Sequence, residues 1–203
     1  MIFSIFLESP IAGLALLASV IFAITIHEAA HAFMAVKLGD DTPKAQGRLT
    51  LNPFSHLDPW GTLLIIFAGI GWGKPVVFNQ FNLKNIRRDI ALVAMAGPVS
   101  NFLLAVILSI VIRIPFIYQI DFVYFLIQNF IFLNIALCVF NLIPIEPLDG
   151  FKVVSGILPP HLALQWEETK KYGIIVLVFL LLTGSVEKIV FPIVNFITYN
   201  LLF

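Results

Sequence analysis

Three long apolar stretches constrain this chain more than any other feature of its sequence. They run from about Pro10 to Val36, from Asp89 to Ile112, and from Phe122 to Ile143. A helix that crosses a bilayer needs about 20 mainly apolar residues, and each stretch is long enough. Hydrophobic residues make up 60% of the 203 residues and charged residues 12%, which is more apolar than one water-soluble core requires. The sequence therefore predicts an all-α, polytopic membrane protein.

Two shorter apolar segments, Gly61 to Ile70 and Gly173 to Thr183, are too short for ordinary spans. They are typical of re-entrant, tilted or half-spanning helices. The sequences GRLTLNPFSHLDP and GWGKPVVFN between the first two long helices favour short strands and turns. We expect a helical bundle with a re-entrant, strand-containing segment at this point. No internal repeat or linker appears, so we expect a single domain over 1–203 with its core in 10–151.

Charge and cysteine content exclude several classes of protein. The twelve basic and twelve acidic side chains give no net charge, which does not favour a nucleic-acid partner. The only cysteine, Cys138, lies in an apolar run and is interpreted as a small buried side chain. The amino-terminal stretch has Glu8 where a signal peptide would carry basic residues, so we expect a retained membrane helix.

The first long helix contains the sequence HEAAH at residues 27–31. Four residues of α-helix return His27 and His31 to nearly the same face, one turn apart, where both imidazoles can bind one ion. Zinc binds imidazole nitrogen readily, and Glu28 is placed to take a proton from a water at the metal. Ionisable groups in an apolar helix are costly, which favours this interpretation over polar side chains that merely bond neighbouring helices.

A catalytic zinc usually has three protein ligands, so a third must come from elsewhere in the chain. Asp149 is the strongest candidate because it follows a helix end that Pro144 and Pro147 must interrupt. Broken backbone in a membrane is tolerated where protein or a water-filled cavity satisfies the freed groups. Asp149 is alternatively a turn aspartate before Gly150. The other candidates are His56, His161 and, more weakly, Glu146.

Several motifs together resemble the site-2 proteases, the intramembrane zinc metalloproteases. The resemblance covers most of the chain and rests on HEAAH (27–31), GRLTLNP (47–53), HLDPWGT (56–62), GWGKPV (71–76), AGPVSN (96–101) and FNLIPIEPLDG (140–150).

The resemblance implies one zinc ion held by His27, His31 and Asp149, with Glu28 as general base. It also implies that Asn141 lies near the reacting carbonyl or the substrate backbone. The substrate would be a membrane protein with a transmembrane segment, held in extended form beside the stretch near residues 72–77. Further candidates for a substrate cleft are His56, Trp72, Lys74 and Asn101.

The same ligand set constrains the topology. If Gly61 to Ile70 crossed the membrane, His31 and Asp149 would lie on opposite sides and could not share an ion. A re-entrant segment brings them together and places most basic residues on one face, namely Lys37, Lys44, Arg48, Lys74, Lys84, Arg87, Arg88, Lys152, Lys170 and Lys171. Arg113 falls on the other face. Basic residues accumulate in cytoplasmic loops, so we expect the active site toward the cytoplasmic side.

Two other functions are compatible with a membrane metal site. One is a catalytically silent metal-binding or scaffold protein, although no member of the catalytic set is missing. The other is a metal transporter, whose ligands would be distributed at several depths along a pathway. The predicted ligands gather at one depth, which favours the protease.

Overall fold

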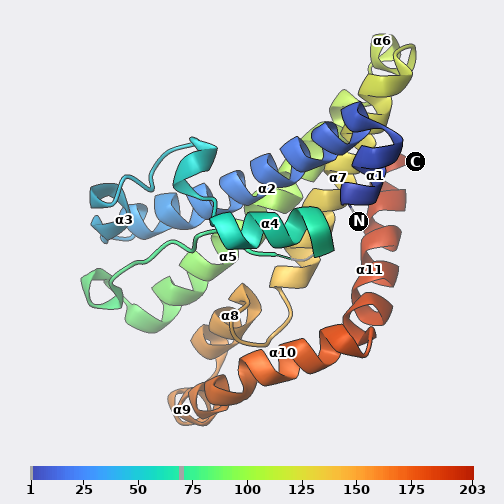
Figure 1. Ribbon diagram of the computed structural model, residues 1–203. Coiled ribbons are helices and arrows are strands. Elements are labelled where there is room, and N and C mark those ends of the chain that lie inside the picture. The colour runs from blue at the N-terminus through green and yellow to red at the C-terminus, as the bar shows by residue number, and fades with distance from the viewer. Residues whose placement is uncertain (1, 69–70) are drawn as a thin grey trace.

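The computed structural model of this protein describes residues 2–68 and 71–203, and its regular structure is helical (Figure 1). The three expected membrane helices are present. They are α2 (Pro10–Lys37), α5 (Ile86–Val111) and α7 (Asp121–Asn141). By length and composition each is able to cross a bilayer, and α5 packs against both α2 and α7. The all-α, polytopic fold is therefore confirmed.

The remaining helices within the described ranges are short. They are α1 (Ile2–Glu8), α3 (Thr42–Ala45), α4 (Pro59–Ala68), α6 (Pro115–Tyr118), α8 (Asp149–Ile157), α9 (Pro160–Glu168), α10 (Gly173–Leu182) and α11 (Ser185–Leu202), with 3-10 turns η1 (Pro53–Ser55), η2 (Gln80–Asn82) and η3 (Thr169–Tyr172). Figure 1 shows α1, α6 and the carboxyl terminus at one end of the bundle, and α3, α8 and α9 toward the other. The carboxyl-terminal end of α2 therefore lies at the same end of the bundle as the start of α8.

The helix α4 corresponds to the shorter apolar segment expected at Gly61 to Ile70, of which Gly69 and Ile70 lie outside the described residues. Its 10 residues extend for roughly 15 Å at 1.5 Å per residue, about half of a hydrocarbon core of about 30 Å. This length agrees with a segment that enters the membrane without crossing it.

The last apolar region bends at Gly184, between α10 and α11. Gly184 adopts a left-handed backbone with φ of 67°, which a glycine accepts without steric cost. The continuous helical run Pro160–Leu182 and the helix α11 are bent by 78° relative to each other. Pro192 lies inside α11 and does not end it. The region forms either a broken span or a re-entrant pair by length and composition.

The expected short strands do not form within the described residues. A single antiparallel bridge joins Leu57 to Gly73, and the Lys74 amide donates to the His56 carbonyl over 2.8 Å. Residues 71–78, called the strip below, are non-helical and have no neighbouring strand among the described residues apart from this bridge. The reason is that side chains of other elements take up several of the strip's backbone groups, as described for the site.

A core of aliphatic side chains joins α5, α7 and α11. Its buried members are Ala105, Ile112, Ile131, Ile135, Val186, Val190 and Val194. Large apolar side chains such as Phe22, Phe33 and Ile110 instead point outward on the long helices. Exposed apolar surface of this extent is expected where lipid rather than water surrounds the bundle.

Candidate metal centre

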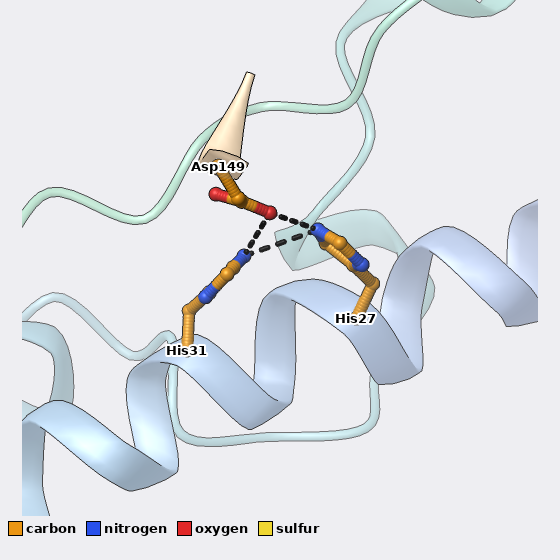
Figure 2. Close-up of side chains that lie close together, drawn as sticks. All are labelled: His27, His31 and Asp149. Carbon is orange, nitrogen blue, oxygen red and sulfur yellow. Dashed lines mark hydrogen bonds and ion pairs between the residues drawn. The ribbon is translucent and has the colours of Figure 1, made fainter. Parts of the chain in front are cut away.

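The two histidines of α2 form one side of the candidate site. The Nε2 atoms of His27 and His31 lie 3.1 Å apart, and both side chains are buried. Their rings are perpendicular, with centroids 4.6 Å apart. The helical spacing of four residues therefore brings both nitrogens to one point, as Figure 2 shows.

Asp149 approaches the same point from the first turn of α8. Its Oδ2 atom lies 3.0 Å from Nε2 of His27 and 3.2 Å from Nε2 of His31 (Figure 2). The sequence separation of 122 residues is bridged because α7 returns the chain to the end of α2 that carries the histidines.

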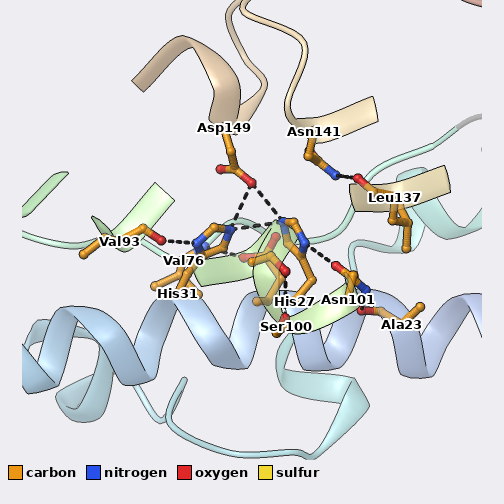
Figure 3. Close-up of polar contacts among 12 residues, drawn as sticks. Ala23, His27, His31, Val76, Val93, Ser100, Asn101, Leu137, Asn141 and Asp149 are labelled. Atoms are coloured by element: carbon orange, nitrogen blue, oxygen red, sulfur yellow. Dashed lines mark hydrogen bonds and ion pairs between the residues drawn. The ribbon is translucent and has the colours of Figure 1, made fainter. Parts of the chain in front are cut away.

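The outer nitrogens of both rings are held by hydrogen-bond acceptors. Nδ1 of His31 lies 2.7 Å from the Val93 carbonyl oxygen, and Nδ1 of His27 lies 2.6 Å from Oδ1 of Asn101 (Figure 3). A carbonyl oxygen only accepts, so each Nδ1 must carry a proton and donate it. A neutral imidazole then presents a bare Nε2 lone pair to the centre.

Asn101 is itself fixed in this orientation. Its amide nitrogen donates to the Ala23 carbonyl over 3.1 Å and to Oδ1 of Asn134 over 2.8 Å. Asn134 in turn donates to the Phe130 carbonyl of its own helix over 2.8 Å. All three long helices therefore contribute to holding the ring of His27.

The donor set fits a bound cation. Two imidazole lone pairs and a carboxylate oxygen converge with no proton between them, an arrangement that a positive ion would stabilise. Tetrahedral zinc with bonds of about 2.0–2.2 Å places its ligand atoms roughly 3.3 Å apart, close to the observed separations of 3.0–3.2 Å. Two imidazoles and a carboxylate are also a donor set typical of catalytic zinc.

Gly97 of α5 leaves the space that this centre needs. A Cβ atom at this position would lie 2.5 Å from Nε2 of His31 and 2.6 Å from Nε2 of His27. No larger residue fits there without moving the rings. The Gly97-Pro98 pair therefore allows α5 to pack closely against α2, and α5 remains helical through Pro98.

The centre opens into a cavity of about 350 Å³. Glu28 lines this cavity with the strip and the end of α7. Its Oε2 atom accepts a hydrogen bond of 3.0 Å from the Val76 amide. The cavity is lined by His27, Glu28, His31, Trp72, Pro75, Val76, Asn141, Asp149 and Lys152, among others. A carboxylate, a metal ligand set and an extended backbone segment thus share one space.

The structure distributes the remaining candidate residues differently. Trp72 and Asn141 line the cavity, and the Asn141 amide nitrogen donates to the Leu137 carbonyl over 3.0 Å (Figure 3). Lys74 is absent from the cavity lining, and its backbone bonds to His56. Asn101 lies behind His27 rather than in the cavity.

The alternative third ligands lie elsewhere. His56 is fully buried, and its Nε2 contacts the Thr50 carbonyl oxygen over 2.8 Å. His161 is exposed on α9. Glu146 pairs with Lys170 over 3.4 Å. None of the three contacts the two histidines of α2 among the described residues.

Sequence reasoning missed three contributors to the site. Asn134 is a polar residue in an apolar helix, a signal that could have indicated a buried network. Arg48 belongs to a motif that was noted without a role for its side chain. The Val93 carbonyl has no sequence signal, because only the packing of α5 against α2 brings it to His31.

Comparison with known proteins finds zinc metalloproteases among the relatives of this chain. The sequence profile of peptidase family M50 matches residues 116–184. The chain is 41% identical over 187 residues to a protein of Bacillus subtilis (strain 168) named "Putative zinc metalloprotease YwhC", covering 89% of this chain and 85% of that protein. It is 31% identical over 180 residues to "Putative zinc metalloprotease Rip2" of Mycolicibacterium smegmatis (strain ATCC 700084 / mc(2)155), covering 86% of this chain and 69% of that protein. No solved structure matches the chain significantly.

Proposed function

Since the chain belongs to peptidase family M50, the site-2 protease family of zinc metalloproteases, we propose that it cuts peptide bonds in or beside transmembrane segments of other membrane proteins. The observation that carries this proposal is the convergence of His27 and His31, from the long apolar helix α2, with Asp149 of α8, in a cavity that Glu28 also lines. The proposed metal is one zinc ion per chain, held by these three side chains.

The position of the site along α2 supports cleavage near one membrane surface. His31 lies roughly 9 Å along the helix axis from Lys37, at 1.5 Å per residue. Lys37 ends the helix, and a basic residue at this position is typical of the lipid headgroup region. The substrate bond would therefore lie inside the bilayer but close to its edge.

We propose that this edge faces the cytoplasm. The end of the bundle that carries the site comprises α3, the first turn of α5 and α8, and it holds most of the basic residues, among them Lys44, Arg87 and Lys152. Arg113 lies at the other end, where its guanidinium donates to the Leu201 carbonyl over 3.2 Å. Such an asymmetry favours a cytoplasmic site under the positive-inside rule.

The catalytic roles follow from the positions of the side chains in the cavity. Zinc, when bound, supplies Lewis-acid polarisation of a peptide carbonyl and makes a water more acidic. Glu28 takes a proton from the attacking water and passes it to the leaving amine, which requires its carboxylate to remain in the cavity. Asn141 would stabilise the oxygen on which negative charge develops, after its amide releases the Leu137 carbonyl.

The strip is suited to hold an extended substrate. A transmembrane helix keeps its own amides hydrogen-bonded, so it must unwind locally before a carbonyl is attacked. The strip lies beside Glu28, and unwound substrate backbone would bond, as a strand does, to those of its backbone groups that Arg48, Glu28 and His56 do not occupy.

The proposal is tested with purified protein in lipid vesicles and a panel of single-span membrane peptides. Cleavage sites are mapped by mass spectrometry, with Glu28→Gln protein as the matched control. We expect cuts within or next to the apolar segment that the control does not make. Cuts confined to water-soluble peptides would overturn the membrane-substrate proposal while leaving the protease itself intact.

A further inference from the structure

Arg48 is a buried cation beside the catalytic cavity. The proposed mechanism gives this residue no role. Arg48 follows Gly47, whose left-handed backbone turns the chain after α3, and it is only 5% exposed. Its Nη1 atom is buried and has no hydrogen-bond partner among the described residues. Burying a guanidinium with an unpaired nitrogen costs free energy. The hydrogen bonds that Arg48 does make must compensate for that cost.

Those contacts are with the backbone of the strip. Nη2 of Arg48 donates to the Lys74 carbonyl and, over 2.7 Å, to the Pro75 carbonyl. One guanidinium nitrogen thus fixes two consecutive peptide groups. A planar guanidinium restricts direction as well as distance, which a lysine ammonium does not.

The second of these peptide groups also reaches the catalytic base. The Val76 amide belongs to the same peptide group as the Pro75 carbonyl, and it donates to Oε2 of Glu28 over 3.0 Å. The bond from the Lys74 amide to the His56 carbonyl holds the same edge of the strip. Arg48 is also close enough for electrostatic attraction to Glu28.

We propose that Arg48 is a positioning residue for the proposed protease, on which this inference rests. Arg48 sets the orientation of the peptide groups at residues 74 and 75, and thereby aims the Val76 amide at Glu28. Glu28 has three rotatable side-chain bonds, and the Val76 amide limits the directions that its carboxylate adopts. Arg48 acts through the strip and does not itself touch the metal ligands.

The test compares Arg48→Gln, Arg48→Lys, Val76→Pro and the Arg48→Gln/Val76→Pro double variant. Val76→Pro removes the amide hydrogen that bonds Glu28, since proline has no backbone N–H. Arg88→Gln, an exposed arginine of α5, controls for loss of a basic charge. Each protein is assayed for zinc content, for kcat and KM on a membrane substrate, and for hydrogen exchange of peptides that cover the strip.

We expect Arg48→Gln and Val76→Pro each to lower kcat by roughly 10- to 100-fold, as misplacement of a catalytic group does, with zinc retained. The double variant should lose no more than the worse single variant, because both changes break one chain of contacts. Arg48→Lys should recover only part of the activity. Strip amides should exchange faster in both Arg48 variants than in wild type or Arg88→Gln.

Losses that multiply in the double variant, or full activity in Arg48→Lys, would overturn the inference. So would unchanged exchange of the strip in Arg48→Gln. The exchange measurement does not depend on turnover. If wild type cuts no membrane substrate while strip exchange still responds to Arg48, the proposed function fails and the contact between Arg48 and the strip stands.

Discussion

Oδ1 of Asn101 lies 2.6 Å from Nδ1 of His27, on the side of the ring away from Asp149. This contact requires the proton on Nδ1 and leaves Nε2 for a metal. Asn101 is fully buried, and its amide nitrogen is bonded to two other helices, so the side chain has one orientation available. The metal ligand set therefore depends on a residue that does not itself face the metal.

Replacing Asn101 by Ala should weaken zinc binding by roughly 10- to 100-fold, the usual effect of losing the partner of a ligating histidine. The reason is that the His27 ring loses both its preferred tautomer and its orientation. Competition with a zinc chelator measures the change. Ser100→Ala, in the next position of α5, serves as the control and should bind zinc as wild type does.

Gly97→Ala should abolish or strongly reduce zinc binding, because the added methyl group would lie 2.5 Å from Nε2 of His31. Val99→Ala on the exposed side of the same helix should have no such effect. Metal content and thermal unfolding of both variants in detergent provide the comparison. A Gly97→Ala protein with wild-type zinc affinity would show that α5 and α2 are farther apart than described.

Asp40, just after α2, should contribute to stability above acidic pH. Its buried carboxylate accepts hydrogen bonds from the Thr42 amide and hydroxyl, from the Asn79 amide and from the Asn82 side chain. Burial alone raises the pKa of Asp40, but these bonds outweigh it and lower the pKa below its usual value of 3.8. Asp40 thus ties the end of α2 to the chain that follows the strip.

Asp40→Asn should therefore cost about 2 kcal/mol near neutral pH, the scale of one or two hydrogen bonds to a charged group. A lowered pKa stabilises the folded state fully above the unfolded pKa of about 3.9, and this stabilisation is lost as pH falls through the folded value. Thermal unfolding should thus separate wild type from the variant at pH 5–7, and the difference should shrink progressively as pH falls from about 4 through the lower folded pKa. Asp41→Asn, at an exposed neighbour, should match wild type throughout.

The proposed topology is testable by cysteine labelling. In a Cys138→Ala background, single cysteines at Lys44 and Arg87 should react with a membrane-impermeant reagent from the same side, and one at Arg113 from the opposite side. The reason is that α4 is too short to carry the chain across. Lys44 and Arg87 labelled from opposite sides would contradict the shared metal site.

The sequence predicted the parts of this structure that depend on local patterns. The long spans follow from composition alone, and the paired histidines follow from helical spacing. Pro144 and Pro147 indicated the helix break after which Asp149 reaches the metal centre.

Features that depend on packing were not predictable in the same way. The motif containing Asn101 suggested a substrate cleft, whereas the side chain points at His27, because the rotation of α5 about its axis decides its direction. The strip was expected to be a strand, yet Arg48 and Glu28 occupy its backbone groups in place of a neighbouring strand. Such contacts join segments with no common sequence pattern.

The central claim is that His27, His31 and Asp149 hold one zinc ion while Glu28 acts on the substrate. The most direct measurement is zinc content per chain, with protease activity, of wild type, His27→Ala, Asp149→Ala and Glu28→Gln proteins purified in detergent. We predict about one zinc in wild type and in Glu28→Gln, loss of zinc in the other two, and activity in wild type alone. Wild type without metal, full zinc retention in Asp149→Ala, or unchanged turnover in Glu28→Gln would contradict the account.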